Sequence, residues 1–257
     1  MASDISRNSE SAIAVYVDFE NLALGVQDTK AGRFEIELVL KRVLEKGRVV
    51  AKRAYCDWTR YRQFMQEFHK HGFEMIDIPQ TKVSGKNSAD IRMVVDALDL
   101  CYSKDHIDTF VLLTGDSDFS PLVSKLKEND KRVIGCGVRN STSDLLASSC
   151  DEFIFYDDLI TVSKRPRRRA KPAKNKEQEE ALDKVASTVE SLSRDYDPLW
   201  GSLVKQTVRR VYPDFNETLY GYRSFSELLE DAAKQGVLDL EFDEQRGNYK
   251  VRSHGGG

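Results

Sequence analysis

Acidic residues follow several apolar segments of this 257-residue sequence. Asp18 ends the run AIAVYVD, Asp116 and Asp118 come directly after VLLTG, and Asp90 opens a helix-like segment in GKNSAD. A single acid at such a place more often caps a helix or faces solvent. Four acids from three segments repel one another when they converge, and a bound divalent cation relieves that repulsion. Because carboxylate oxygens suit Mg²⁺ or Mn²⁺, these four residues are predicted to be catalytic metal ligands.

Neighbouring polar residues complete the candidate site. Asn21 follows Asp18 closely, and its neutral amide can position a ligand or a water molecule. Lys86 precedes Asp90 and can orient or neutralise a phosphate. A zinc site is not indicated, because the four histidines (His69, His71, His106 and His254) do not have zinc-ligand spacing.

Other chemistries lack their motifs. The sequence has no GxGxxG after its first apolar run, no GxxxxGK[ST] and no GxSxG. A dinucleotide site, the common nucleoside-triphosphate loop and a serine-hydrolase nucleophile therefore have no support. The chemistry that remains is metal-assisted hydrolysis of a phosphodiester bond.

Apolar strands and amphipathic helices alternate through the first 160 residues. The predicted strands cover residues 12–19, 48–58, 73–79, 108–119 and 131–138, and the predicted helices cover 33–47, 60–72, 88–103 and 120–130. Repeated β-α units predict an α/β fold, a mostly parallel sheet with helices on both faces. The carboxyl ends of such strands carry the functional site, and the acids lie there.

Four segments, VYVDFENL, RAYCDW, GKNSADIRMVVDAL and LLTGDSDFSPLV, resemble in this order the NYN domains of the PIN-like nuclease superfamily. The resemblance covers about residues 12–160, within a domain placed at 12–162, and implies a PIN-like fold and a divalent-metal-dependent (endo)ribonuclease. By this resemblance the pocket is formed by Asp18, Asn21, Asp90, Asp116 and Asp118, with the hydroxyl residues Thr114 and Ser117 nearby to help position substrate.

Two further acids are assigned less direct roles. Asp96 follows Asp90 by six residues, about 240° around a helix, and is expected to point elsewhere. Asp57, in the RAYCDW segment, is expected either to support the pocket or to have a structural role.

The C-terminal part has a different pattern. Helices are predicted over 175–193, 198–215 and 225–236, followed by a hairpin over 237–253, which is typical of a winged helix. Residues 177–252 resemble the LOTUS (OST-HTH) domain, which implies binding of RNA or of a protein partner. This part holds ten basic and sixteen acidic residues, so it lacks the broad basic face of a duplex reader. Lys205, Arg209 and Arg210 are the predicted local RNA contacts, alongside Arg223.

A basic linker, residues 163–176, joins the two predicted domains. Residues 164–176 contain eight basic residues and no acid, which favours sequence-independent contact with phosphates; a plain solvated tether is the alternative. The predicted RNA contacts are Lys164, Arg165, Arg167, Arg168 and Arg169. Residues 1–11 and 253–257 are predicted to be flexible ends.

Composition sets the remaining limits. No run approaches the ~20 apolar residues that cross a bilayer, the N-terminus does not resemble a signal peptide, and the cysteines form no CxxC pair. The prediction is a soluble, cytoplasmic ribonuclease with Mg²⁺ or Mn²⁺ as cofactor and RNA, more readily single-stranded, as partner. A catalytically idle RNA-binding or scaffold protein with the same fold is the alternative, and a DNA-directed nuclease is a weaker one.

Overall fold

The computed structural model describes residues 10–27, 33–79, 87–164 and 176–254. The chain divides into two compact units, with the division between residues 165 and 166, and each unit is described by itself. Among the described helices, none is long and apolar enough to cross a membrane.

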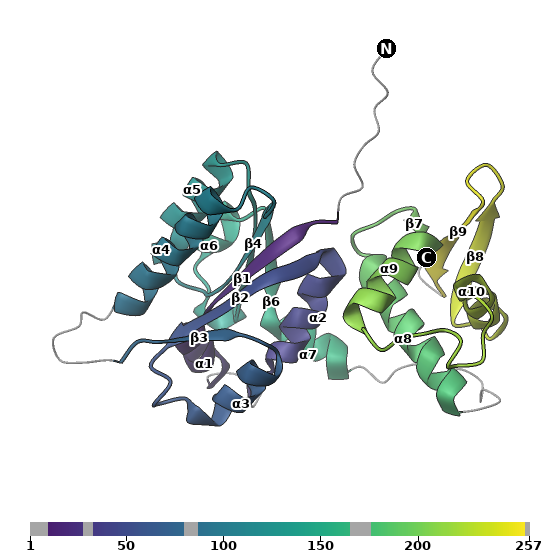
Figure 1. Ribbon diagram of the computed structural model, residues 1–257, viewed down its shortest axis with the longest axis horizontal. Coiled ribbons are helices and arrows are strands. Elements are labelled where there is room, and N and C mark those ends of the chain that lie inside the picture. Colours follow the sequence, from purple (N-terminus) through teal and green to yellow (C-terminus); the bar gives the residue numbers. More distant parts are fainter. Residues whose placement is uncertain (1–9, 28–32, 80–86, 165–175, 255–257) are drawn as a thin grey trace, which may run out of the picture. The chain divides into compact units, whose positions relative to one another are not determined.

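The first unit is built on a six-stranded parallel sheet (Figure 1). Its strands are β1 Ala12–Asp18, β2 Arg48–Cys56, β3 Glu74–Asp77, β4 Thr109–Leu113, β5 Arg132–Gly137 and β6 Glu152–Phe155. Every neighbouring pair runs parallel, in the order β3-β2-β1-β4-β5-β6. The order reverses between β1 and β4, and sheets of this kind bind ligands at the strand ends beside such a reversal.

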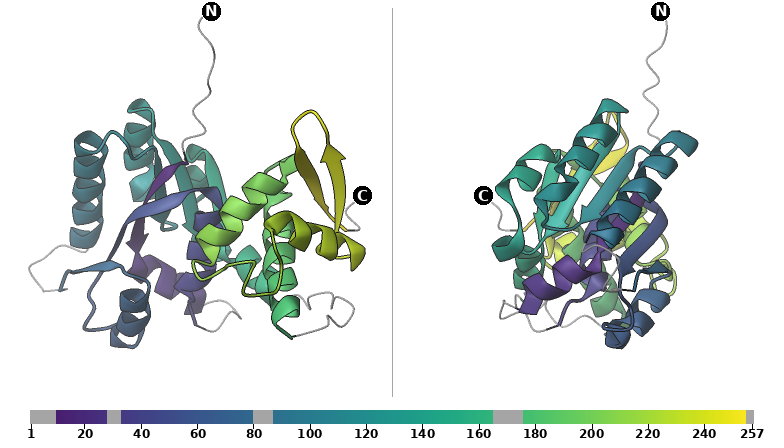
Figure 2. Two further views of the ribbon diagram at one scale, coloured as in Figure 1. Left: turned by 45° about the vertical axis from the view of Figure 1, so that its right-hand side comes forward. Right: turned by 90° about the vertical axis from the view of Figure 1, so that its left-hand side faces the viewer.

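Helices cover both faces of this sheet (Figures 1 and 2). They are α1 Phe19–Gln27, α2 Ile36–Lys46, α3 Arg62–Lys70, α4 Ser88–Ser103, α5 Ser120–Glu128, α6 Asp144–Ser149 and α7 Tyr156–Lys164. On one face α4, α5 and α6 pack around Tyr16 and Phe110. On the other face α1, α2, α3 and α7 pack around Phe19 and Phe68. The α/β fold expected from the sequence is confirmed.

Burial on both sides explains why the central strands are so apolar. Every residue of β1 and of β4 is buried, because both strands lie between neighbours and under helices. Burying a large apolar side chain stabilises the fold by roughly 1.5–3 kcal/mol. Burial therefore makes β1 and β4, at whose ends the candidate site lies, a stable part of the sheet. The edge strand β3 is only partly buried.

Several elements of the first unit differ from the sequence prediction. α1 begins at Phe19, directly after β1, whereas the predicted strand included residue 19 and the next predicted element began at residue 33. Strand β4 ends at Leu113, six residues before the predicted end, because the chain turns into the short 3₁₀ helix η1 Ser117–Phe119. The segment α6–β6–α7 was not predicted.

Over residues 176–254, the second unit contains three helices and a small antiparallel sheet. The helices are α8 Lys176–Leu192, α9 Gly201–Val211 and α10 Phe225–Lys234, and the strands are β7 Leu199–Trp200, β8 Leu238–Asp243 and β9 Asn248–Ser253. The sheet order is β7-β9-β8. Leu182, Val204 and Leu228, one from each helix, lie in a single apolar core with Val251 of β9.

Candidate active site

Asp18 lies at the carboxyl end of β1, beside the point where the strand order reverses. Its side chain is only 7% exposed. The hydroxyl of Thr114 donates a hydrogen bond to Oδ2 of Asp18 at 3.0 Å, and the backbone N–H of Asn21 donates to Oδ1 at 3.3 Å. Two bonds thus fix the orientation of this buried carboxyl.

Asn21 connects α1 to the loop that follows β4. Its side-chain oxygen accepts a hydrogen bond from the backbone N–H of Gly115 at 2.8 Å. Since Asn21 lies three residues after Asp18, this bond holds the ends of β1 and β4 together. In this structure the amide has a positioning role within the protein.

Thr114 links two of the acids. Its hydroxyl donates to Asp18 and accepts a hydrogen bond from the backbone N–H of Asp116 at 3.2 Å. The residue is fully buried, and its own N–H donates to the carbonyl of Cys136 in β5. The Thr114 hydroxyl therefore joins β1 to the loop after β4, and the Thr114 backbone joins that loop to β5.

Asp116 and Asp118 lie in the turn after β4. Oδ1 of Asp116 accepts the backbone N–H of Asp118 at 2.9 Å and caps η1. Asp116 and Ser117 are partly buried and Asp118 is exposed, whereas Phe119 is buried in the core and anchors the turn. One carboxylate oxygen of Asp116 is thus used by the turn.

Asp90 approaches from the first turn of α4. Burial, followed by the negative charges of Asp116 and Asp118, raises the pKa of the Asp90 carboxyl. Burial, and then the charge of Asp90, also raises the pKa of Asp18 to about 7, although the bonds from Asn21 and Thr114 lower it in part. The acids from three segments therefore interact electrostatically.

The donor set suits a hard divalent cation. Carboxylate oxygens are the ligands that Mg²⁺ and Mn²⁺ prefer, and positive charge would offset the repulsion that raises these pKa values. In the described ranges, no three His, Cys, Asp or Glu side chains are placed to hold a metal ion as they stand. The carboxylates are therefore near enough to raise one another's pKa values. Their side chains would need to move to enclose an ion.

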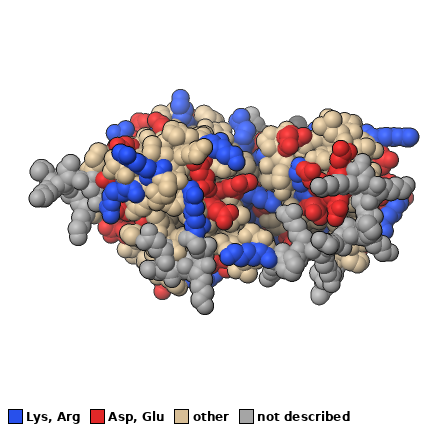
Figure 3. Space-filling model, turned by 90° about the horizontal axis from the view of Figure 1, so that it is seen from below, with Lys and Arg blue, Asp and Glu red and all other residues tan. Residues whose placement is uncertain are grey.

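Seen from the strand ends, acidic side chains gather on the first unit and Lys and Arg side chains lie around them (Figure 3). Arg60, just after β2, forms an ion pair with Glu20 of α1 at 3.0 Å. No sequence signal identifies this pair, because forty residues separate its members.

The loop after β5 packs against the β4 loop. The backbone N–H of Ser143 donates to the carbonyl of Gly115 at 2.9 Å. A Cβ on Gly115 would lie 2.4 Å from the carbonyl oxygen of Ser141, so only glycine fits there. The glycine between Thr114 and Asp116 is the sequence signal for this close approach.

Other acids named from the sequence have partners of their own. Asp96 accepts hydrogen bonds from the Tyr55 hydroxyl at 2.9 Å and from Nε of Arg92 at 3.0 Å, which ties α4 to β2. Asp57 accepts bonds from the backbone N–H and the hydroxyl of Thr59. Both have structural partners away from the four acids. Lys86 lies outside the described residues.

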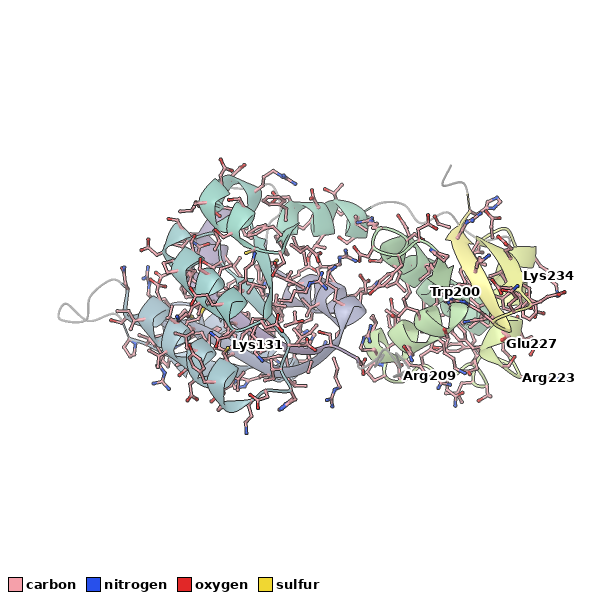
Figure 4. All side chains as sticks on the ribbon, turned by 90° about the horizontal axis from the view of Figure 1, so that it is seen from above. Lys131, Trp200, Arg209, Arg223, Glu227 and Lys234 are labelled. Carbon is pink, nitrogen blue, oxygen red and sulfur yellow. The ribbon has the colours of Figure 1, made fainter. Side chains whose placement is uncertain are left out.

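The predicted RNA contacts of the second unit are largely engaged within it. Arg209 binds both carboxylate oxygens of Glu217, at 3.1 and 3.2 Å, and Lys205 lies 3.5 Å from the same group. Glu217 is 6% exposed, so its charge is compensated in place. Arg210 donates to the Thr207 hydroxyl at 3.3 Å. Arg223 lies well apart from Arg209 in Figure 4.

The linker residues are mostly outside the described ranges. Lys164 is the last residue of α7 and is exposed. Arg165, Arg167, Arg168 and Arg169 fall on residues 165–175, which the structure does not describe.

Residues 12–158, more than half of the chain, match the NYN domain family. The chain belongs to this family. NYN domains form part of the PIN-like nuclease superfamily, so the match supports a nuclease role in general. The matched residues include all four acids, Asn21 and Thr114, so the family domain contains the whole site described above.

Two relatives extend the comparison. The chain is 27% identical over 170 residues to the uncharacterized protein MJ0482 of Methanocaldococcus jannaschii, a match that covers 66% of this chain and 65% of that protein. The chain therefore spans slightly less than two thirds of that relative's length. A crystal structure of a protein of unknown function, VPA0982 from Vibrio parahaemolyticus, superposes with a TM-score of 0.52 at 28% identity. That match covers 62% of this chain and 98% of VPA0982.

Proposed function

We propose that this NYN protein is a divalent-metal-dependent ribonuclease that hydrolyses phosphodiester bonds of single-stranded RNA. The observation that carries the proposal is the electrostatic coupling of Asp18, Asp90 and Asp116, which come from three segments and meet at the reversal of strand order. Holding such charges together lowers the stability of the folded protein. A purely structural protein has no reason to maintain a destabilising cluster of acids.

The proposed roles follow from the contacts. Asp18, Asp90, Asp116 and Asp118 would hold Mg²⁺ or Mn²⁺, which supplies a Lewis acid to offset the charge that develops on the phosphate. Thr114 orients Asp18 and the Asp116 backbone through its two bonds. Asn21 keeps the two strand ends together.

RNA is proposed over DNA because of the family resemblance, and a flexible single strand because its backbone can bend a phosphate into the pocket. The eight basic residues of 164–176 add affinity for phosphates without reading sequence. The nuclease domain is proposed to extend over 12–162, the linker over 163–176 and the second domain over 177–252. Four unpaired cysteines fit a reducing cytoplasm.

The second unit is proposed to be a LOTUS-type winged helix. Its element order is helix, short strand, two helices and a hairpin, with the first strand added to the hairpin sheet, which supports this assignment. Its charges favour a protein ligand over RNA. Lys205 and Arg209 are paired with Glu217, and the exposed side of α10 carries Glu227.

A cleavage assay tests the nuclease. Full-length protein is incubated with labelled single-stranded RNA or DNA, with Mg²⁺, Mn²⁺ or EDTA. We expect RNA cleavage that needs metal, and a loss of at least about 100-fold in Asp116→Asn, because this change removes a ligand charge. Asp105→Asn, an exposed acid after α4, is the matched control and should cleave normally.

Three results would contradict the proposal. Equal cleavage by Asp116→Asn and wild type would remove the acids from the chemistry. RNA binding without cleavage under any metal would favour the catalytically idle alternative. Faster cleavage of DNA than of RNA would favour a DNA-directed nuclease.

A further inference from the structure

Helix α4 carries an apolar stripe that is exposed among the described residues of its unit. Ile91 is 64% exposed, Val95 55% and Tyr102 58%, whereas Met93, Ala97 and Cys101, which face the core, are buried. In Figure 2 α4 lies at the outer edge of its helical layer. Large apolar side chains grouped on one exposed helix face commonly mark an interaction surface.

The spacing of the stripe is that of a coiled coil. Ile91, Val95, Leu98 and Tyr102 are separated by four, three and four residues, which places them at alternating d and a positions of a heptad. Leu98 is partly buried and the other three are exposed. A helix that needs only to cover its own sheet has no use for a second apolar seam, whereas a partner helix fits this one.

The flanking charges select the partner and its direction. Arg92 and Asp99 both occupy the e position, seven residues apart, beside the stripe. In a parallel pair the e positions face g positions, here Val94 and Cys101, which carry no charge. In an antiparallel pair e faces e, so Arg92 of each copy meets Asp99 of the other. The helix is thus electrostatically complementary to a reversed copy of itself.

We propose that α4 is a homodimer interface in which two copies of this chain pair antiparallel across a two-fold axis. Ile91 of each copy packs on Tyr102 of the second copy, and Val95 packs on Leu98 of the second copy. Both halves are identical, as a two-fold contact requires. Arg92 already bonds Asp96 of its own helix through Nε, and its terminal nitrogens can bind the second carboxylate.

The pairing fixes where the two candidate sites lie. Asp90 is one residue before the seam and faces position 103 of the second copy in this register. The two Asp90 residues are therefore thirteen residues apart along the helix axis, about 20 Å at 1.5 Å per residue. The dimer itself does not depend on the proposed nuclease activity.

The expected affinity is low. One helix face with four apolar residues is smaller than a standard stable interface, and weak transient complexes lie in this range. We expect a dissociation constant on the order of 10 µM, so that dimers form at high protein concentration.

Sedimentation equilibrium of the full chain from about 1 to 300 µM tests the interface. Wild type should change from monomer to dimer over this range, and Val95→Asp should raise the dissociation constant at least about 30-fold because it places two charges in the seam. Leu145→Asp, at a 60% exposed position on α6, is the matched control and should dimerise as wild type. Both positions are exposed, and circular dichroism checks that both variants fold.

Two further measurements test the orientation. Arg92→Glu and Asp99→Lys should each weaken the dimer, and the double variant should restore it. A mixture of Ile91→Cys and Tyr102→Cys proteins should form a disulfide-linked dimer on mild oxidation, and Ile91→Cys alone should not. A wild type that stays monomeric, a Val95→Asp protein that dimerises normally, or self-linking of Ile91→Cys would overturn the proposal.

Discussion

The buried carboxyl of Asp18 combines two opposing demands. A carboxyl that is 7% exposed is most stable when protonated, and its pKa of about 7 reflects this. A metal ligand, however, must be ionised. The bonds from Thr114 and Asn21 hold the oxygens in place, while the positive charge of an ion would favour the ionised form. As a proposed metal ligand, the Asp18 carboxylate would therefore be most stable with a cation bound.

The metal-free protein should lose stability as the pH rises. The Asp18 pKa is about 7 in the folded chain, against 3.8 ordinarily, so between these values the folded state keeps a proton that the unfolded state has lost. The free energy of unfolding should fall from about pH 4 to about pH 7 and then level off. Urea unfolding in EDTA across this range measures the slope.

Asp18→Asn should reduce this slope, leaving the part that comes from the raised pKa of Asp90, and should stabilise the metal-free protein at pH 8 by about 1–3 kcal/mol while abolishing cleavage. Asp105→Asn serves again as the control and should keep the wild-type slope. Identical pH profiles for Asp18→Asn and wild type would show that Asp18 titrates normally.

The role of the Thr114 hydroxyl can be tested by two variants, one that removes the hydroxyl and one that keeps it. Thr114→Val keeps the shape but removes both hydrogen bonds, so we expect a loss of about 1–3 kcal/mol in stability. The pKa of Asp18 should also rise further, because the bond from Thr114 lowers it. Carbon-13 NMR titration of the aspartate carboxyls gives the pKa. Thr114→Ser keeps the hydroxyl and should behave as wild type; a defect as large as that of the valine variant would point to lost packing instead.

At the scale of elements, the sequence pattern predicted helices and strands best where one face, or every face, of the element is buried. Helix α4 has the bounds that its periodicity indicated, 88–103, because Met93, Ala97 and Cys101 form a regular buried face. The apolar strands β1 and β4 were recognisable because both of their faces are covered. The positions of the four acids were predictable for the same reason, since each follows or opens such an element; their role as metal ligands stays a prediction.

Short or tightly joined elements were not predictable. Helix α1 starts at the residue after β1, so no loop composition separates the two. Strand β7 has two residues and exists only through its pairing with β9. The pairing of Lys205 and Arg209 with Glu217 also depends on the folded loop, and the pattern indicated free cations instead.

The β4 loop gives a prediction for an element. A methyl group on Gly115 would lie 2.4 Å from the Ser141 carbonyl oxygen, so Gly115→Ala must separate the loops after β4 and β5. Such overpacking typically costs about 1–3 kcal/mol. We expect a lower melting temperature and a loss of cleavage larger than the stability change explains, because Asp116 is the next residue. A variant with wild-type melting and cleavage would show that the loops adjust freely.

At the scale of the whole molecule, charge is divided along the chain. The two units are acidic and residues 164–176 are basic, so we propose that the segment between them makes the non-specific phosphate contacts. Binding and chemistry should therefore be separable by substitution.

Neutralising Lys164, Arg165, Arg167, Arg168 and Arg169 should weaken RNA binding and flatten its salt dependence. Each lost phosphate contact on a single strand reduces the slope of log K against log salt by roughly 0.7. The maximal rate at saturating RNA should stay near wild type, since uniform binding does not alter the chemical step. Fluorescence anisotropy at several salt concentrations measures the slope. Replacing the four arginines by lysine keeps the charge and should preserve it; an unchanged slope after neutralisation would make the segment a spacer.

The bond between Thr114 and Asp18 joins residues 96 positions apart. In a chain growing on the ribosome, Asp18 is synthesised early. The residues that complete the pocket, Thr114 and the loop after β4, are synthesised 96 residues and more later. At synthesis rates of 5–20 residues per second, that interval lasts about 5–20 s. Throughout it the nascent chain carries an incomplete acidic pocket beside the messenger RNA that encodes it. Long-range closure of the pocket would thus delay the proposed cleavage until most of the first unit has been made.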